Sequence, residues 1–365
     1  MKKTVAVVGG GYGGTLVAEA LDKTADVILI DPRDAFVNVA ASLRALTQPS
    51  WAANAFFPYD TLLRRGRHVR ERAVSVDGNG VALSDGSRVG ADYIVLATGS
   101  SYSYPARPHL IDAGVAEALS DLRATHEQLE KAERVLILGA GPVGLELSGE
   151  IREVWPNKHV TIVDRSTEVL PGYLQEIRGD LHRQLEALDI ELRLGTSVPE
   201  LPPTPEGIVG NFTVTTTGGE EINADIWFRS FGSRVNTDYL SDGALIALSE
   251  RNTVPVTAEL NVVGYENVYA LGDIADLTDP KMATWAQTQA AVVVENIRAQ
   301  LEGRTQDSQY LPTSSQRIFL PLGSTAGVGQ LPTPDGSPSP APLNTVIDRK
   351  GRDLFSSRYA ERFHL

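Results

Sequence analysis

The sequence predicts an α/β fold with two doubly wound parallel-sheet domains, the second inserted in the first, followed by a small C-terminal α+β unit. Two observations predict this fold. The stretches VAVVGGGYGG (5–14) and VLILGAGPVG (135–144) each combine a short apolar run, a glycine turn and the start of a small-residue helix. Each is followed by a strand that ends in an acid. This order is typical of a Rossmann fold, so we expect two Rossmann-like dinucleotide-binding domains.

The glycines of each stretch have separate physical roles. The first permits a tight turn, the second lets the backbone approach a pyrophosphate, and the third lets the helix pack closely against the strand. These positions are Gly9, Gly11 and Gly14 in the first stretch, and Gly139, Gly141 and Gly144 in the second. The N–H groups at the start of the helix then face the phosphates. Asp31 and Asp164 close the next strands, where a carboxylate accepts a hydrogen bond from a ribose hydroxyl.

The remaining elements follow in an order that divides the chain. We expect a β-meander over 68–99 that returns to a buried strand at 93–99, because alternating residues are punctuated by Asn-Gly and Asp-Gly turns. The later elements are helices near 115–133 and 174–188, a strand at 191–195, a meander at 211–228, a strand at 267–275, a helix over 283–301, a strand at 316–322 and a Pro- and Ser-rich loop at 331–342. The predicted units are 1–105 and 241–301 for the first domain, 106–240 for the inserted domain, and 302–365 for the C-terminal unit.

Composition excludes several function classes. The 365 residues carry a formal net charge of -13, which argues against a nucleic-acid partner. There is no Cys, so disulfides, thiolate metal sites and redox-active Cys pairs are excluded. The six His residues show no metal-binding spacing, and we expect no metal. Because the first apolar run is already a Rossmann strand and no apolar run reaches the length of a membrane span, we expect a cytoplasmic protein.

Over about residues 1–300, the order of these motifs resembles the glutathione-reductase-like flavoproteins. The resemblance implies that the first domain binds FAD and that the inserted domain binds NAD(P)H. It places Gly9, Gly11 and Gly14 at the FAD pyrophosphate, Asp31 at its ribose, Thr98 and Gly99 where the chain passes close to the cofactor, and Asp273 at the ribitol chain. Further candidate cofactor-binding residues are Gly13, Pro32, Arg33, Val74, Ala97, Val143, Gly232, Gly272 and Ala283.

The inserted domain carries the residues that this resemblance assigns to the nicotinamide cofactor. Glu146 and Glu150 are four residues apart, so they share one face of the predicted helix. They match a family pattern in which the first acid lies near the nicotinamide, which makes Glu146 a candidate catalytic residue. Asp164 favours NADH by repelling a 2′-phosphate, whereas the adjacent Arg165 attracts one. The residues therefore favour NADH and leave NADPH open.

Several later segments resemble the ferroptosis suppressor branch of the apoptosis-inducing-factor-like proteins. They are FVNVAASLRAL (36–46), PKMATWAQTQAAVVVENI (280–297), GVGQ (327–330) and RDLF (352–355). This resemblance implies NAD(P)H:quinone oxidoreductase activity, with Arg44, Lys281 and Met282 near the flavin and Lys281 tuning its potential. The chain is also similar to type II NADH dehydrogenases, but both glutamines of their A-Q-x-A-x-Q quinone pattern are Thr here, at Thr284 and Thr288.

The electron acceptor is the open part of the predicted function. Without Cys, we expect a quinone-like small molecule, and the alternatives are a ferredoxin-type protein acceptor or a slowly reoxidised flavoprotein that signals by binding. The end of the chain, residues 349–365, predicts a basic amphipathic helix. Three interpretations remain open for it: peripheral contact with the inner face of a membrane, pairing in a homodimer, and docking on the chain's own domains. The last two interpretations together are favoured over the membrane, because apolar stripes at helical spacing are usually core.

Overall fold

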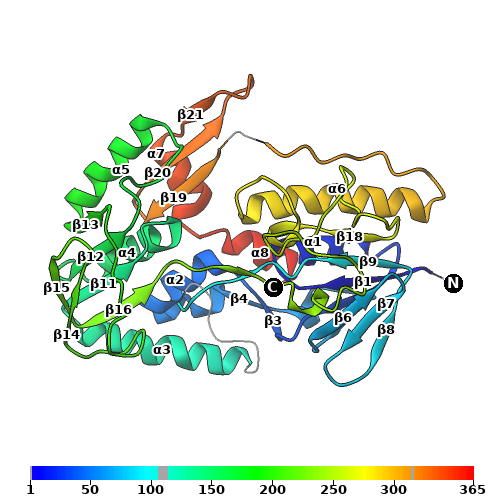
Figure 1. Cartoon of the computed structure of the whole chain (residues 1–365), viewed down its shortest axis with the longest axis horizontal. Helices are drawn as coiled ribbons and strands as arrows, with labels where there is room; N and C mark the ends of the chain where they lie inside the picture. Colours follow the sequence, from blue (N-terminus) through cyan, green and yellow to red (C-terminus); the bar gives the residue numbers. More distant parts are fainter. Residues whose placement is uncertain (1, 106–113, 314–315) are drawn as a thin grey trace.

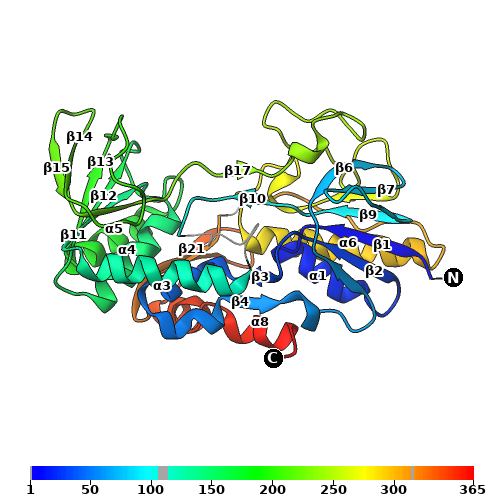
Figure 2. The same cartoon turned by 90° about the horizontal axis from the view of Figure 1, so that it is seen from below.

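The computed structural model describes residues 2–105, 114–313 and 316–365. Figures 1 and 2 show an elongated molecule, with the strands that include β1 (Thr4–Val8) near one end and those that include β11 (Arg134–Leu138) near the other. Two parallel sheets form these two ends. The chain builds most of the first sheet, leaves it to build the second, and returns to the first with β18 (Val268–Ala270). The predicted insertion of one α/β unit into another is thus present in the topology.

The first sheet has the strand order β18-β9-β1-β2-β5, and all its pairings are parallel. Its strands are β1 (Thr4–Val8), β2 (Asp26–Ile30), β5 (Arg67–Val69) and β9 (Tyr93–Leu96), together with β18. Alternate residues of β1 point to opposite faces, because side chains alternate along a strand. Val5 and Val7 pack with helices α1 (Tyr12–Leu21) and α6 (Ala283–Leu301). Ala6 and Val8 pack toward the meander of β6 (Ala73–Asp77), β7 (Gly80–Leu83) and β8 (Arg88–Gly90).

The second sheet has the order β13-β12-β11-β16 and is also parallel. Its strands are β11 (Arg134–Leu138), β12 (His159–Asp164), β13 (Ile190–Leu194) and β16 (Ile226–Arg229). One face packs with helices α3 (Val115–Lys131), α4 (Pro142–Val154) and α5 (Gln175–Ala187), and the other with the hairpin β14 (Phe212–Thr215) and β15 (Glu221–Ala224). The boundaries of the predicted units remain predictions, and the one between 105 and 106 adjoins 106–113, outside the described residues.

Further elements lie outside these two sheets. They are β3 (Ala35–Val37), α2 (Val39–Thr47), η1 (Pro49–Asn54), β4 (Phe56–Pro58), η2 (Tyr59–Thr61), β6 (Ala73–Asp77), β7 (Gly80–Leu83), β8 (Arg88–Gly90), β10 (Ser100–Ser101), β17 (Arg234–Val235), η3 (Asp238–Leu240), η4 (Gly272–Ile274), α7 (Leu343–Val346) and η5 (Ile347–Gly351). The helix predicted over 283–301 agrees with α6. Within the described residues, no helix is both long enough and apolar enough to span a membrane.

The C-terminal unit contains an antiparallel sheet that the sequence pattern only partly predicts. Strand β19 (Ile318–Leu322) agrees with the prediction and pairs with β20 (Ala326–Pro332). The predicted loop at 331–342 is wrong in part, because β21 (Pro338–Pro340) pairs with the last three residues of β20, Gln330 to Pro332. Prolines are tolerated there because β21 is an edge strand. The sheet rests on α4 and α5 of the inserted unit.

The continuous amphipathic helix predicted at 349–365 is wrong. Leu354 and Phe355 adopt left-handed backbone conformations, with φ of 52° and 63°, so no continuous helix can run through them. Helix α8 (Ser356–Arg362) begins directly after Phe355. The apolar face of α8 lies against the first unit, where Tyr359 and Phe363 are 3% and 0% exposed and form ring contacts with Phe36. Docking on the chain's own domains is therefore confirmed for these side chains, and they offer no free apolar face to a membrane.

Candidate active site

The first glycine loop leaves backbone N–H groups open at the start of α1. Gly9 has φ of 102°, which favours glycine, and a Cβ on Gly14 would lie 1.9 Å from the Gly9 carbonyl oxygen. Gly11 is the N-cap of α1 and supplies no side-chain hydrogen bond. A Cβ on Gly11 would meet no atom closer than 4.0 Å. The loop therefore packs tightly against protein at Gly9 and Gly14 and leaves open space at Gly11. This open space would let a phosphate group approach the start of the helix.

The second glycine loop repeats this geometry at the start of α4. Gly139 has φ of 113°, and a Cβ on Gly144 would lie 2.0 Å from the Gly139 carbonyl oxygen. Gly141 is the N-cap of α4, and a Cβ built on it meets nothing within 4 Å. Val143 lies in the first turn of α4. Both predicted loops therefore have the strand, turn and helix geometry of a dinucleotide-binding fold.

Asp31 lies at the end of β2, as predicted, but its carboxylate already has partners. Oδ2 accepts hydrogen bonds from the Gly10 N–H at 2.6 Å and from Arg33 Nη2 at 2.7 Å. Oδ1 accepts from the N–H and from Nε of Arg33, at 3.0 and 2.8 Å. Burial alone would raise the pKa of Asp31, but Arg33 and these N–H groups hold the pKa below its usual value. A ribose hydroxyl would therefore bind Asp31 only if the Arg33 side chain turned away.

Asp164 lies at the end of β12, where it is fixed by two backbone donors. Its carboxylate accepts the N–H of Ala140 at 2.6 Å and the N–H of Ser166 at 2.7 Å. These bonds tie the acid to the second glycine loop, because Ala140 lies between Gly139 and Gly141. Arg165 is exposed beside it. The fixed carboxylate and the adjacent cation are both placed where a ribose of a dinucleotide would lie in this fold.

A pocket lies between η4 and the start of α6. Its lining includes Gly272, Asp273, Lys281, Met282 and Trp285. Gly272 has φ of 73°, and in the described part of the chain no group bonds the partly buried Asp273 carboxylate. The indole Nε1 of Trp285 is buried and has no hydrogen-bond acceptor among the described residues. An unpaired carboxylate and an unpaired donor beside the first glycine loop fit a polar cofactor such as FAD.

The structure also brings the segment 97–99 onto the first loop. A Cβ on Gly9 would lie 2.5 Å from the Ala97 carbonyl oxygen and 2.8 Å from Thr98 Cα. Thr98 Oγ1 donates to the Asn236 carbonyl at 2.7 Å, so this segment is tied to the chain that follows β16. Gly99 has φ of 63° and space around it for a Cβ.

The remaining predicted residues are spread over both units. Gly232 has φ of 86° beyond β16, Val74 is 47% exposed on β6, Met282 and Ala283 begin α6, and Pro32 lies in the loop after β2. Gly13 faces protein instead of open space, because a Cβ on it would lie 2.3 Å from Leu271 and 3.0 Å from the Ala286 carbonyl oxygen. Its small size lets α1 pack against α6.

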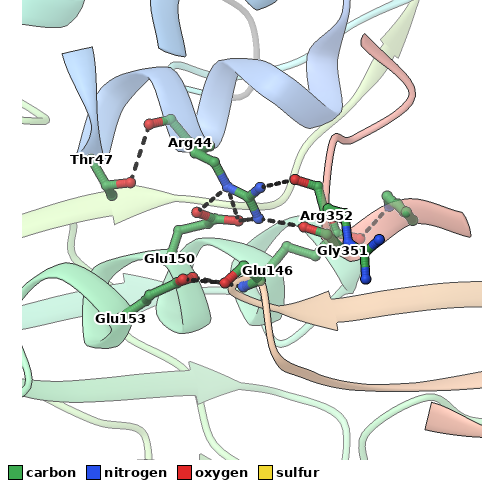
Figure 3. A network of polar contacts seen from close by, with 9 residues as sticks. Arg44, Thr47, Glu146, Glu150, Glu153, Gly351 and Arg352 are labelled. Carbon is green, nitrogen blue, oxygen red and sulfur yellow. Dashed lines mark hydrogen bonds and ion pairs between the residues drawn. The ribbon is translucent and has the colours of Figure 1, made fainter. Parts of the chain in front are cut away.

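Arg44 and Glu150 form a buried ion pair between α2 and α4 (Figure 3). Arg44 is 2% exposed and Glu150 is 3% exposed, and Arg44 Nη2 lies 2.7 Å from Glu150 Oε1. The same guanidinium donates to the carbonyl oxygens of Gly351 and Arg352, at 2.9 and 3.1 Å. Arg44 therefore joins three segments that are far apart in the sequence.

Glu146 lies one turn before Glu150 and pairs with Lys350, whose Nζ is 2.5 Å from Oε1. Burial raises the pKa of Glu146 and of Glu150 even though Lys350 and Arg44 oppose that shift. The structure thus brings Glu146 and Arg44 into one cluster, whereas Lys281 lines the pocket at the start of α6. Sequence reasoning missed Lys350, because the basic residues near it were interpreted as one side of an amphipathic helix.

A family model described as pyridine nucleotide-disulphide oxidoreductase matches residues 3–292. The chain belongs to this family. Ferroptosis suppressor protein 1 of Taeniopygia guttata is 32% identical over 366 residues, covering 97% of this chain and 94% of that protein. Among solved structures, the sulfide:quinone oxidoreductase of Aquifex aeolicus has a TM-score of 0.75 at 17% identity, covering 99% of this chain and 91% of that one. NDH2 of Plasmodium falciparum, in complex with NADH, has a TM-score of 0.73 at 13% identity, covering 100% and 98%.

Membership of the pyridine nucleotide-disulphide oxidoreductase family confirms the predicted fold class and the predicted oxidoreductase class. The matched region begins before the first glycine loop and ends within α6, so it contains both loops and the Asp273 pocket. This member of the family has no Cys anywhere in its 365 residues. Its electrons therefore cannot leave through a thiol of this chain.

Proposed function

We propose that the chain is an FAD-dependent NAD(P)H oxidoreductase that passes electrons to a quinone-like acceptor. The observation that carries the proposal is the pair of open glycine loops, one beside the Asp273 pocket and one in the inserted unit, in a chain without Cys. When bound, FAD would supply the ring that accepts hydride from the nicotinamide. The similarity to ferroptosis suppressor protein 1 and the fold shared with a sulfide:quinone oxidoreductase support a quinone-like acceptor.

In this proposal the first unit holds FAD through its backbone and two acids. The open start of α1 at Gly11 binds the pyrophosphate, because its free N–H groups face an anion. Asp273 binds a hydroxyl of the ribitol chain, which satisfies its unpaired carboxylate. Asp31 binds the ribose after Arg33 turns away, and Arg33 is then free to contact the adenosine.

The inserted unit holds the nicotinamide cofactor at the start of α4. Gly141 leaves space for the pyrophosphate, and Asp164 accepts the ribose hydroxyls. Glu146 lies further along α4, with Lys350 keeping its carboxylate in one orientation. We propose that Glu146 orients the nicotinamide. Lys281, in the lining of the pocket at the start of α6, would stabilise negative charge near the flavin.

Turnover with a soluble quinone tests this function. We expect the FAD-loaded protein to oxidise NADH slowly in buffer under anaerobic conditions and many times faster when a soluble benzoquinone is added. The measurement is the loss of NADH absorbance. Faster turnover with a ferredoxin than with the quinone would assign the acceptor to a protein instead, and no stimulation by either would contradict the proposed electron output.

Replacing Asp164 by serine is expected to shift the preference from NADH toward NADPH. The substitution removes the charge that repels a 2′-phosphate and leaves Arg165 to attract it. We expect the ratio of kcat/KM for NADH to that for NADPH to fall by about 10- to 100-fold, which corresponds to about 1.4–2.7 kcal/mol. Asp189→Ser, on an exposed acid of the same unit, is the control and should leave the ratio unchanged.

A further inference from the structure

A cluster of unpaired cations lies at one end of the first sheet. It consists of Lys2, Lys23, Arg64, Arg65 and Arg67, all exposed, and we call it the basic edge. Lys2 Nζ and Arg65 Nη1 both donate to the Lys23 carbonyl oxygen, at 2.9 and 3.3 Å, so these side chains converge. Arg67 begins β5, the edge strand of the sheet.

The charges of the basic edge are left without ion pairs in the described part of the chain. Within the described residues no ion pair involves any of its five members. Many other exposed arginines are paired, for example Arg88 with Asp77, Arg183 with Asp180 and Arg304 with Glu302. Three acids share this edge of the sheet. Asp22 is buried and accepts the N–H groups of Arg64, Arg65 and Gly66. Asp92 pairs with Lys3, and Asp26 begins β2. Five positive charges without an ion pair thus outnumber these carboxylates, on a chain whose net charge is -13.

The basic edge lies opposite the edge of the sheet that carries the glycine loop. Strands β1, β2 and β5 are parallel, so their first residues share one edge and the loop of Gly9 and Gly11 lies at the other. Strand β1 has five residues and so spans about 16 Å. Figures 1 and 2 place the start of the chain at the end of the molecule farthest from β11 and β12. A redox protein docked at the basic edge would lie far from the proposed flavin.

We propose that the basic edge docks the protein on the anionic headgroups of a lipid surface. Positive residues at one end of an acidic molecule orient it, because the remaining negative surface turns away from the lipid. Charges on an edge strand also discourage strand pairing, but only Arg67 lies in β5, and the other four lie outside it. A nucleic acid is not favoured, because the Arg64–Arg72 segment has no Phe, Tyr or Trp to stack on bases.

This docking does not require the proposed quinone activity. The two claims can fail separately. Vesicle binding reports the basic edge alone, and turnover with a soluble benzoquinone reports the electron output alone.

Vesicle sedimentation of the FAD-loaded protein tests the proposal. The test variant is Arg64→Gln/Arg65→Gln/Arg67→Gln, and the matched control is Arg183→Gln/Arg193→Gln/Arg234→Gln, which removes three charges elsewhere. We expect binding to phosphatidylglycerol-containing vesicles, no binding to pure phosphatidylcholine, and weakening with added salt. At about fivefold per charge, the test variant should bind about 100-fold more weakly, and the control should bind like the unmodified protein.

Three results would overturn this inference. The first is that the protein binds neutral vesicles as tightly as anionic ones. The second is that the control variant loses as much vesicle binding as the test variant. The third is that the protein binds soluble polyglutamate as tightly as anionic vesicles, which would indicate an acidic protein partner. Circular dichroism and the flavin absorbance of both variants should match those of the unmodified protein. Turnover with a soluble benzoquinone should be the same in all three proteins.

Discussion

Replacing Arg44 by methionine is expected to destabilise the folded protein by about 3–5 kcal/mol, because the substitution leaves the Glu150 carboxylate buried without its partner. The carbonyl oxygens of Gly351 and Arg352 lose their donors as well. The measurement is the free energy of unfolding from urea titration of the FAD-loaded protein. The matched control is Arg183→Met, which breaks an exposed pair with Asp180 and should cost less than about 1 kcal/mol.

The loss should depend on pH in a defined direction. The pKa of Glu150 is raised above 4.5 by burial, and removing Arg44 raises it further. The folded protein tolerates a protonated Glu150 carboxyl. The destabilisation caused by Arg44→Met should therefore be smallest below pH 4.5, the ordinary pKa of a Glu carboxyl, and should grow as the pH rises through the raised pKa of Glu150 in the folded protein. The double variant Arg44→Met/Glu150→Leu should recover most of the loss. A loss that is independent of pH would contradict a buried ion pair.

Replacing Gly11 by alanine is expected to weaken FAD binding by about 100-fold, or about 2.7 kcal/mol, without unfolding the protein. Gly11 has φ of -81°, which alanine adopts readily, and its Cβ would touch no protein atom closer than 4.0 Å. The new methyl group would instead occupy the space through which the pyrophosphate approaches the start of α1. The measurement is FAD affinity by flavin fluorescence titration of the apoprotein.

Gly141→Ala is the matched control for FAD binding. It makes the same change in the second loop, where φ is -73° and nothing lies within 4 Å of the Cβ. We expect it to retain FAD. Equal loss of FAD in both variants, or retention in both, would contradict the assignment of FAD to the first loop.

The sequence predicts the local parts of this site well, because they depend on short-range geometry. Gly9 and Gly139 require positive φ, and Gly14 and Gly144 require the absence of a Cβ, so the fingerprints identify both loops at the correct residues. Alternation and apolar runs likewise predict the buried strands. The family match confirms the fold class that these motifs indicate.

The sequence does not predict contacts between distant segments. Nothing in residues near Arg44 indicates that its guanidinium meets Glu150 and the carbonyl of Gly351. The resemblance assigns Arg44 to the flavin. That role stays a prediction, because the described partners of the Arg44 guanidinium are Glu150 and two backbone carbonyl oxygens. The amphipathic pattern at 349–365 was also misleading, since the left-handed Leu354 and Phe355 interrupt a spacing that is otherwise helical.

Anaerobic reduction of the bound flavin by NADH tests the central claim, that the two loops hold two different dinucleotides and together form one electron input. The unmodified protein and Gly141→Ala, both loaded with FAD, are mixed with NADH while the flavin absorbance is recorded. We predict rapid bleaching in the unmodified protein. In Gly141→Ala we predict bleaching that needs about 100-fold more NADH to reach the same rate. Bleaching at the same NADH concentration in both proteins, or none in the unmodified protein, would contradict the account.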